Sequence, residues 1–325
     1  MLLKYWPEKT NATFMSKRFM AFGLSALLML ASIAMIPVRG INFGIDFIGG
    51  TVVEFNQPDG VSAEQVRGVL EPLGFGEVVV NTARGTGVDP EDLFVVRIKT
   101  QPATEELNED QAQTAATALM VQTLREQNWL GDDGNPEFTD TVGPKVSGEL
   151  LRSGLMALGV ALALMLCYIW VRFEWQYSVG AVAALVHDVV LTIGLFALLQ
   201  LEFNLTTIAA LLTIIGYSMN DTVVVFDRVR EELRKYKKMP LGEVIDLALN
   251  GTLSRTLITS GTTLLALLAI FFLGGSVLRG MSGALLWGVF IGTYSSIFVA
   301  SSIVRTIGVP RSKKAIEDVP GFGTS

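Results

Sequence analysis

The sequence predicts an α-helical polytopic membrane protein with six transmembrane helices and an external α+β domain between the first and second of them. Three observations support this fold class. The 325 residues have a mean hydropathy of +0.46 and only 17% charged residues, which is too apolar for a water-soluble protein of this length. Six predominantly apolar runs are long enough to cross the roughly 30 Å hydrocarbon core of a bilayer. Finally, residues 39–149 hold 7 basic and 19 acidic residues, whereas the whole chain has a net charge of −6, so the acidic side chains gather in one water-exposed segment.

The first span is predicted at residues 19–38, directly after a basic tail of residues 1–18. A basic tail before an apolar run is also typical of a secretory signal peptide. This run, however, is long enough to span the bilayer, and no small-residue cleavage pattern followed by polar sequence comes after it. We therefore expect an uncleaved first transmembrane helix.

Five further apolar runs predict a transmembrane bundle within residues 150–304. They lie at Leu151–Val171, Ser178–Leu199, Phe203–Phe226, Thr256–Leu273 and Met281–Val304. Lysine and arginine residues cluster in the first tail, at Arg172, in the loop 227–254 and in the last tail, residues 305–325. If the spans alternate, all four clusters lie on one side of the membrane, which the positive-inside rule makes the cytoplasm. Both termini are therefore predicted to be cytoplasmic.

The loop 227–254 contains the stretch PLGEVIDLALNG, which predicts a short amphipathic helix on the membrane surface. Pro240 suits the first turn of such a helix, and Gly251 suits its end. We interpret it as a connector between two spans.

The external segment, residues 39–149, alternates strand-like and helix-like stretches. Strand patterns lie at residues 50–57, 77–83, 93–100 and 136–143, and helix patterns lie at residues 62–73 and 104–127. The order βαββαβ is that of a ferredoxin-like fold with one core. Because that fold carries many unrelated functions, it indicates none by itself.

An amide and a carboxylate, Asn220 and Asp221, lie inside the fourth apolar run. A carboxylate at the centre of a membrane helix costs roughly 2.5–3.5 kcal/mol on insertion scales, so we expect it to face the bundle interior and to have a partner. Small and polar residues share its helical face, at Thr206, Ala210, Thr213 and Tyr217. The nearest candidate partner is Arg255, which antiparallel helices would place at a similar depth. Such a pair either links proton binding to helix movement or only fixes how two helices pack.

His187 and Asp188 lie near the middle of the third run, and one of them is expected to contact the helix that carries Asp221. Each serves either as a hydrogen bond between helices or as part of a proton relay. Gly288 and Gly292 have the GxxxG spacing in the last run, which predicts close helix packing.

Several functional classes are excluded by what the chain lacks. Its one cysteine, Cys167, and its one histidine allow neither a disulfide nor a thiolate cluster nor a multi-histidine metal site. No phosphate-binding glycine loop, serine–histidine–aspartate set or HExxH motif occurs. We expect no enzyme activity, no cofactor and no nucleic-acid partner, with protons as the coupling ion.

Five motifs together carry a resemblance to a known family. They are GIDFIGGTVVEF (44–55), VGPKVSGEL (142–150), HDV (187–189), GYSMNDTVVVFDRVREE (216–232) and LSRTLITS (253–260). In combination they resemble the SecF family of the bacterial SecDF protein-export complex, which is part of the resistance–nodulation–division superfamily. The resemblance covers nearly the whole chain.

The resemblance implies a protein of the bacterial inner membrane with a periplasmic domain. Its implied partners are a SecD-like subunit, the SecYEG channel with its associated proteins, and unfolded preproteins. In the family, the proton motive force is linked to movement of an external domain that promotes protein export. By resemblance, Asp221 is the proton-path aspartate and Arg255 is its paired arginine, with Asn220 matching the same pattern. The SecD subunit supplies a further membrane carboxylate that this chain does not carry.

Two other functions stay open from the residues themselves. One is an efflux transporter of small molecules or lipids in the same superfamily. The other is a passive assembly factor whose buried charges only hold partners together.

Overall fold

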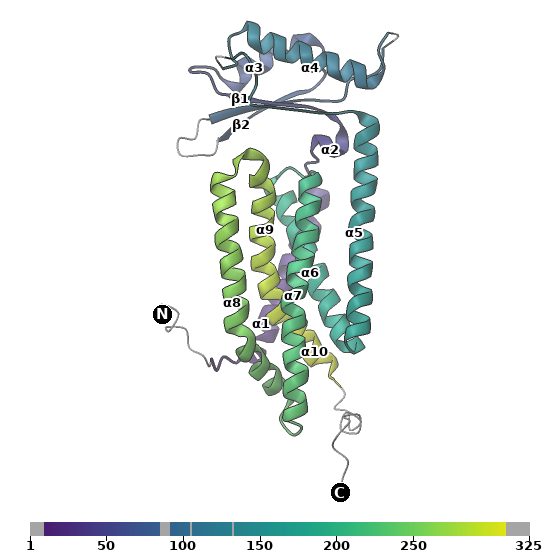
Figure 1. Ribbon diagram of the computed structural model, residues 1–325, viewed down its shortest axis with the longest axis vertical. Helices are drawn as coiled ribbons and strands as arrows, with labels where there is room; N and C mark the ends of the chain where they lie inside the picture. Colours follow the sequence, from purple (N-terminus) through teal and green to yellow (C-terminus); the bar gives the residue numbers. More distant parts are fainter. Residues whose placement is uncertain (1–9, 85–91, 105, 132, 310–325) are drawn as a thin grey trace.

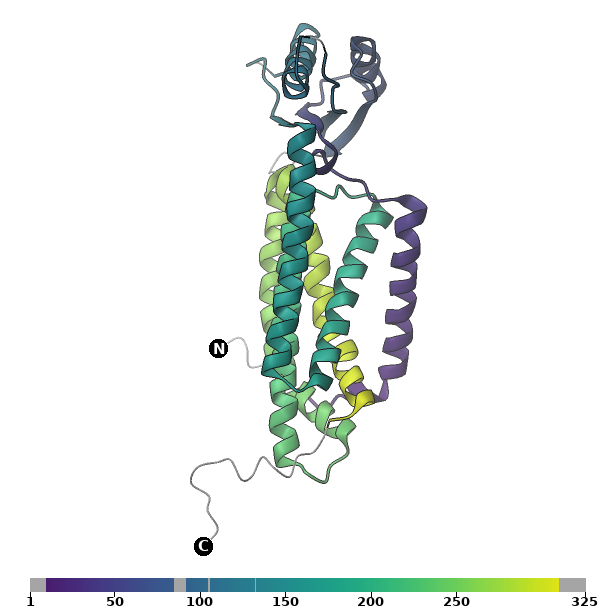
Figure 2. The same cartoon turned by 90° about the vertical axis from the view of Figure 1, so that its right-hand side faces the viewer.

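The computed structural model describes residues 10–84, 92–104, 106–131 and 133–309, and it consists of a helical bundle with an α+β domain at one end (Figure 1). We use "α+β domain" for residues 50–142. The first helix begins, and the last helix ends, at the end of the bundle away from the sheet (Figures 1 and 2). Some basic residues used to predict the orientation lie outside the described residues, namely Lys4, Lys9, Arg311, Lys313 and Lys314.

Six helices in the described part of the chain are long and apolar enough to cross a membrane, which confirms the predicted number. The first five are α1 (Arg18–Arg39), α5 (Pro144–Arg172), α6 (Trp175–Leu199), α7 (Leu205–Lys235) and α8 (Leu241–Leu273). The sixth span is a composite of α9 (Gly275–Ser295), a π-helical turn at Ser296–Ala300 and α10 (Ser301–Ile307). A short 3₁₀ turn at Phe14–Ser16 precedes α1. The chain is therefore a multi-pass membrane protein.

The connection between α7 and α8 differs from the prediction. Only residues 236–240 are non-helical there, because α7 continues to Lys235 and α8 begins at Leu241. The predicted amphipathic helix is the first part of α8, and Gly251 lies inside that helix and does not end it. The reason is tertiary: apolar side chains before Gly251, such as Val244 and Ala248, are fully buried in the bundle. Their burial outweighs the roughly 1 kcal/mol that glycine costs in a helix interior.

The α+β domain has the predicted ferredoxin-like topology. Its strands are β1 (Gly50–Asn56), β2 (Val78–Arg84), β3 (Asp92–Ile98) and β4 (Phe138–Val142), and they form one antiparallel sheet in the order β2-β3-β1-β4. Two helices, α3 (Ala63–Leu70, with a 3₁₀ turn at Glu71–Leu73) and α4 (Glu109–Glu126), cover the face away from the bundle (Figure 1). The helix predicted at residues 104–127 starts later because Asn108 caps α4 through a reciprocal pair of hydrogen bonds with Gln111.

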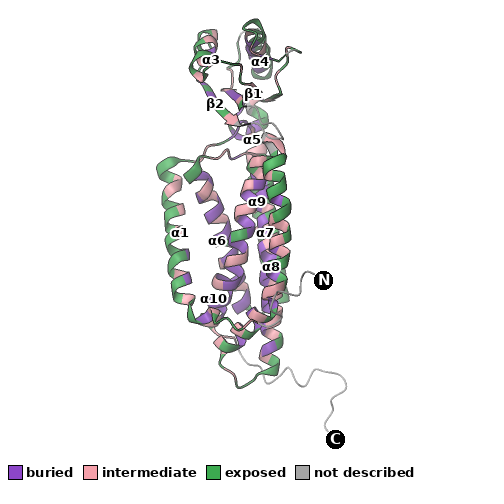
Figure 3. Cartoon of the chain, turned by 90° about the vertical axis from the view of Figure 1, so that its left-hand side faces the viewer, coloured by how far each residue is buried: buried purple, intermediate pink, exposed green. Residues whose placement is uncertain are grey.

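Burial is uneven across the bundle. The buried positions concentrate in α6, α7 and the sixth span, whereas α1, α5 and α8 present mostly exposed side chains (Figure 3). Helix α1 packs mainly on α6, where Gly194 allows the close approach of Ser32. The exposed helices are the ones available to lipid or to a partner chain.

The GxxxG glycines mediate close helix packing, as predicted. Gly288 lies directly against the Ile214 side chain of α7, and a Cβ at Gly292 would lie 3.0 Å from Ser218 Cβ. We expect Gly288→Leu to force α9 away from α7 and to lower the free energy of unfolding by about 1–3 kcal/mol, the usual cost of overpacking. Thermal unfolding of the purified protein in detergent measures this effect. Gly23→Leu in α1 is the matched control, since nothing lies within 4 Å of a Cβ at that position. Equal stability of the two variants would contradict this account of the packing.

Candidate functional site

Asp221 is placed by α7 at the junction of three helices. Its helix starts at a capping box formed by Asn204 and Thr207, and it packs against both α8 and α9. The Asp221 side chain is only 4% exposed, and its Oδ2 atom has no hydrogen-bond partner among the described residues. The Ser260 hydroxyl of α8 lies within reach of the carboxyl group. A buried carboxylate with a free oxygen is a group that gains from taking up a proton.

Arg255 does not form a direct ion pair with Asp221 in the part of the chain that the structure describes. Its charge acts on Asp221 from a greater distance, and its side chain is exposed on α8. The rotation of α8 is the cause. Thr256 and Ser260 are buried toward the bundle, and successive helix residues point about 100° apart, so Arg255 faces outward beside them.

A group of hydroxyls surrounds Asp221. Tyr217 donates to Ser260 Oγ at 3.5 Å, and Ser260 Oγ lies 2.8 Å from Thr293 Oγ1 of α9. We call Asp221, Tyr217, Ser260 and Thr293 the Asp221 cluster. Its members come from α7, α8 and α9, so a change of charge at Asp221 reaches three helices at once.

The predicted inward face of α7 is only partly buried. Ala210 is fully buried, but Thr213 is exposed. A line of small and polar residues on α7 is open to the outside, and it consists of Ala209, Thr213, Gly216 and Asn220. Asn220 therefore points away from the bundle, although Asp221 beside it is buried.

Asp188 is the centre of a second buried cluster. Its Oδ2 atom accepts hydrogen bonds from Ser218 of α7 at 2.5 Å and from Ser295 of α9 at 2.8 Å. Its Oδ1 atom lies 2.9 Å from His187 Nδ1. We call Asp188, His187, Ser218 and Ser295 the Asp188 cluster. As the sequence predicts, one residue of the pair contacts α7, and that residue is Asp188.

The two clusters share α7 and α9. On α7, Ser218 and Asp221 are three residues apart and lie on neighbouring parts of one face, whereas Thr293 and Ser295, two residues apart on α9, point to nearly opposite sides of that helix. The four hydroxyl partners are not predicted from the sequence, and they are Ser218, Ser260, Thr293 and Ser295. No local signal separates them from other serine and threonine residues in membrane helices, which commonly bond to their own backbone.

The α+β domain is tied to the turn between α6 and α7. The Gly44 amide donates to Phe203 O at 2.9 Å, and the Phe203 amide donates to Asn42 O at 2.7 Å. Asp46, in the short helix α2 (Ile45–Ile48) beneath the sheet, accepts from the Leu205 amide at 2.7 Å and so satisfies one more free amide at the start of α7, beside the Asn204 capping box. The segment that leads into β1 is therefore hydrogen-bonded to the beginning of α7.

An ion pair adds to this tie. Arg97 of β3 pairs with Glu202, which lies in the turn between α6 and α7. Burial raises the pKa of Glu202, although the Arg97 guanidinium opposes this change and the Asp46 and Glu54 carboxylates add to it. Both side chains of the pair are partly covered, at 22% and 28% exposure.

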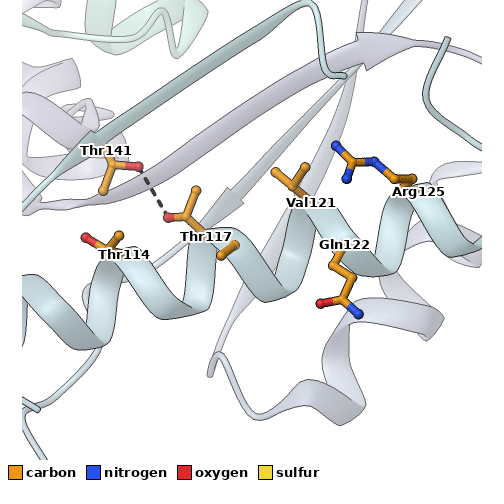
Figure 4. A pocket seen from close by; sticks show the side chains of 7 residues that line it. Thr114, Thr117, Val121, Gln122, Arg125 and Thr141 are labelled. Carbon is orange, nitrogen blue, oxygen red and sulfur yellow. Dashed lines mark hydrogen bonds between the residues drawn. The ribbon is translucent and has the colours of Figure 1, made fainter. Parts of the chain in front are cut away.

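A shallow groove lies apart from these clusters, on the α+β domain between α4 and β4 (Figure 4). It is lined mainly by neutral side chains such as Thr114, Val121 and Gln122, with Arg125 at one end. Thr117 and Thr141 hydrogen-bond across it at 3.3 Å. Among the described residues, no three histidine, cysteine or acidic side chains come together as a metal site.

Comparison with known proteins agrees with the motifs. Residues 128–309 match the family "Protein export membrane protein SecD/SecF, C-terminal", and residues 34–56 match the "SecD/SecF GG Motif". The protein translocase subunit SecF of Rhodobacter capsulatus is 48% identical over 320 residues, which cover 96% of this chain and 93% of that protein. The protein of the same name from Vibrio alginolyticus is 39% identical, over 94% of this chain and 92% of its own.

Solved structures show the same architecture. The crystal structure of SecDF, a translocon-associated membrane protein from Thermus thermophilus, matches with a TM-score of 0.79 and 37% identity over 93% of this chain. SecDF in its super-membrane-facing form matches with a TM-score of 0.65 and 36% identity. In both cases the chain spans only 39% of the length of the SecDF chain.

Proposed function

Because the chain belongs to the SecF family of protein translocase subunits, we propose that it uses proton binding and release inside its bundle to move its α+β domain and so to promote preprotein export. The coupling site is the Asp221 cluster. The bundle lies in the bacterial inner membrane with both termini in the cytoplasm, and the α+β domain faces the periplasm. No chemical catalysis is involved.

The observation that carries the proposal is the state of Asp221. Asp221 is 4% exposed, one of its oxygens is unpartnered, and Arg255 acts on it through its charge without forming a direct ion pair, so the ionised form is costly to bury and the protonated form is an alternative to it. When it is ionised, it attracts Arg255; when it is protonated, that attraction is lost and the hydroxyl groups around it are the better partners. Each proton that crosses the membrane contributes roughly 2.3 kcal/mol per 100 mV, which is enough to bias the packing of α7 against α8.

The ties at the turn between α6 and α7 supply the mechanical link. Both Asp188 and Asp221 lie on helices that end at this turn, and the turn holds the α+β domain through backbone hydrogen bonds at Phe203 and the Arg97–Glu202 pair. A shift of α7 along or about its axis is therefore transmitted to β1 and β3. This connection supports movement of the whole domain as a unit.

Exposed polar groups in the bundle support a membrane partner. Arg255 on α8 and Asn220 on α7 are open to the outside in this chain, and such groups are costly next to lipid. A SecD-like subunit packed on this face would cover both residues and would place its own membrane carboxylate near Arg255. The SecYEG channel and unfolded preproteins are the further partners.

Reconstitution tests the function directly. The chain is purified with its SecD-like partner and placed with SecYEG in vesicles, and export of a preprotein is measured with and without an imposed proton gradient. We expect faster completion of export with the gradient. Equal rates in both conditions would contradict the proposal, and gradient-driven movement of a small molecule would instead favour an efflux transporter.

We expect Arg97→Met to loosen the α+β domain more than Glu202→Gln does. Without Arg97, a partly buried carboxylate loses its compensating charge, whereas glutamine removes the charge and keeps the shape. The distribution of distances between spin labels on Gln122 and Leu273, in a Cys167→Ser background, measures the docking. The contrary outcome is a broader distribution for Glu202→Gln than for Arg97→Met.

The Arg97–Glu202 ion pair also predicts that the contact between the α+β domain and the bundle depends on pH. Because burial raises the pKa of Glu202 in the docked state, that state binds the proton more tightly than an undocked one. The contact of the α+β domain with the bundle should therefore become more stable as the external pH falls through the raised pKa of Glu202. This added stability is complete once the pH lies below the ordinary pKa of a glutamate side chain. Glu202→Gln should abolish the dependence.

A further inference from the structure

The Asp188 cluster contains the single histidine of the chain, and one ring nitrogen of that histidine is unused. His187 and Asp188 are each 1% exposed. His187 Nδ1 lies 2.9 Å from Asp188 Oδ1, whereas His187 Nε2 is buried and has no hydrogen-bond partner among the described residues. A buried histidine normally uses both nitrogens, so the free Nε2 atom needs an explanation.

The contacts of Asp188 determine where the protons are. Both hydroxyls that reach Oδ2, from Ser218 and Ser295, donate to it, and this favours the ionised carboxylate. Oδ1 then accepts from Nδ1–H of His187. In the neutral ring, Nε2 is left as a lone pair that is directed at no donor.

We propose that His187 Nε2 is a second proton-binding atom of the bundle, separate from Asp221. In one state the ring is neutral, and the cluster carries the single negative charge of Asp188. In the other state a proton has been added to Nε2, the ring is a cation, and the histidine–aspartate pair has no net charge. The second state is favourable because a lone charge in a low-dielectric interior is costly and an adjacent opposite charge offsets that cost. Asp188 is the positioning residue, since it holds Nδ1 and orients the ring.

The groups packed around the His187 ring would respond to this change of charge. Among the described residues, the titratable groups in contact with it are Asp188 on its own helix and Tyr294 on α9, whose ring stacks on it with centroids 6.2 Å apart. Helix α7 contributes the Ser218 hydroxyl, and α1 contributes Ser25, which lies 3.1 Å from the Tyr294 hydroxyl. The π-helical turn begins directly after Ser295. Proton uptake at His187 thus acts on the contact of α6 with α9 and, through Tyr294, on α1.

A single histidine makes the test unusually direct. The chain is labelled with ¹⁵N-histidine, carries no polyhistidine tag, and is reconstituted with its unlabelled partner in proteoliposomes. Its two ring nitrogens and its backbone amide nitrogen then give the only labelled signals, and the ring nitrogens are distinguished from the amide by their chemical shifts. We expect a proton on Nδ1 and none on Nε2 at alkaline pH, and a proton on both ring nitrogens after the sample is acidified. A proton on Nε2 at alkaline pH, or an Nε2 atom that stays unprotonated in the acidified sample, would overturn the proposal.

Variants separate a proton site from a structural hydrogen bond. Asp188→Asn removes the charge that favours the cationic ring, so less of the doubly protonated ring should be present than in the unaltered protein at the same acidic pH. Ser282→Ala is the control, because Ser282 is also a buried serine of α9 but donates to its own helix at Leu278 O. It should leave the amount of doubly protonated ring unchanged, and an unchanged amount in Asp188→Asn would refute the role of Asp188. The measurement does not depend on export activity, so it tests the proton site at His187 whether or not Asp221 drives export.

Discussion

Replacing Asp221 with asparagine is expected to abolish the part of preprotein export that depends on the proton motive force. Asparagine has the same shape as aspartate, but it cannot take up and release a proton. With the side chain fixed in a neutral state, the packing of α7 on α8 no longer has two alternatives. We expect export in reconstituted vesicles to fall to the level seen without a gradient.

The same variant should stay folded and assembled. Asp221 is buried with one oxygen unpartnered, so removal of its charge is expected to leave thermal stability unchanged or slightly raised. Asp227→Asn is the matched control on the same helix, because Asp227 is about half exposed and forms a surface pair with Arg172. Surface pairs contribute little, so the control should export normally. Gradient-dependent export at the normal rate in Asp221→Asn would rule out the proposed coupling site.

Arg255→Met is expected to cause a comparable loss of export. Methionine keeps most of the length of the side chain but removes the charge that responds to Asp221. Arg255→Lys should retain part of the activity, because lysine keeps the charge without the planar guanidinium. Since both residues act in one step, the double variant with Asp221→Asn should be no worse than either single variant.

These variants also distinguish coupling from passive assembly. If the charges only hold partners together, Arg255→Met should release the SecD-like subunit in detergent, and proton flux in vesicles should not change. In the proposed mechanism, the partner copurifies and proton flux is lost. Arg172→Met serves as the control, because Arg172 pairs with Asp227 on the outside of the bundle. Loss of copurification with unchanged flux would favour the assembly factor.

The number of spans and the topology of the α+β domain were predictable because their signals are local. Apolar length alone marks a span, and period-two alternation marks the strands now seen as β1 to β4. The error at Gly251 has the same origin. A local helix-stop signal was overruled by burial of Val244 and Ala248, which depends on helices distant in the sequence.

The sequence by itself predicted that Asp221, Asp188 and His187 lie inside the membrane, because a titratable residue within an apolar run can be recognised without any tertiary information. The tertiary structure alone decided which atoms meet. It turned Arg255 outward, brought Ser218 and Ser295 to Asp188, and left His187 Nε2 without a partner. The physical reason is that neighbouring helix residues point about 100° apart, so the rotation of each helix decides its contacts. That rotation is set by packing over the whole bundle, as at Gly288 against Ile214, and not by the residues beside each charged group.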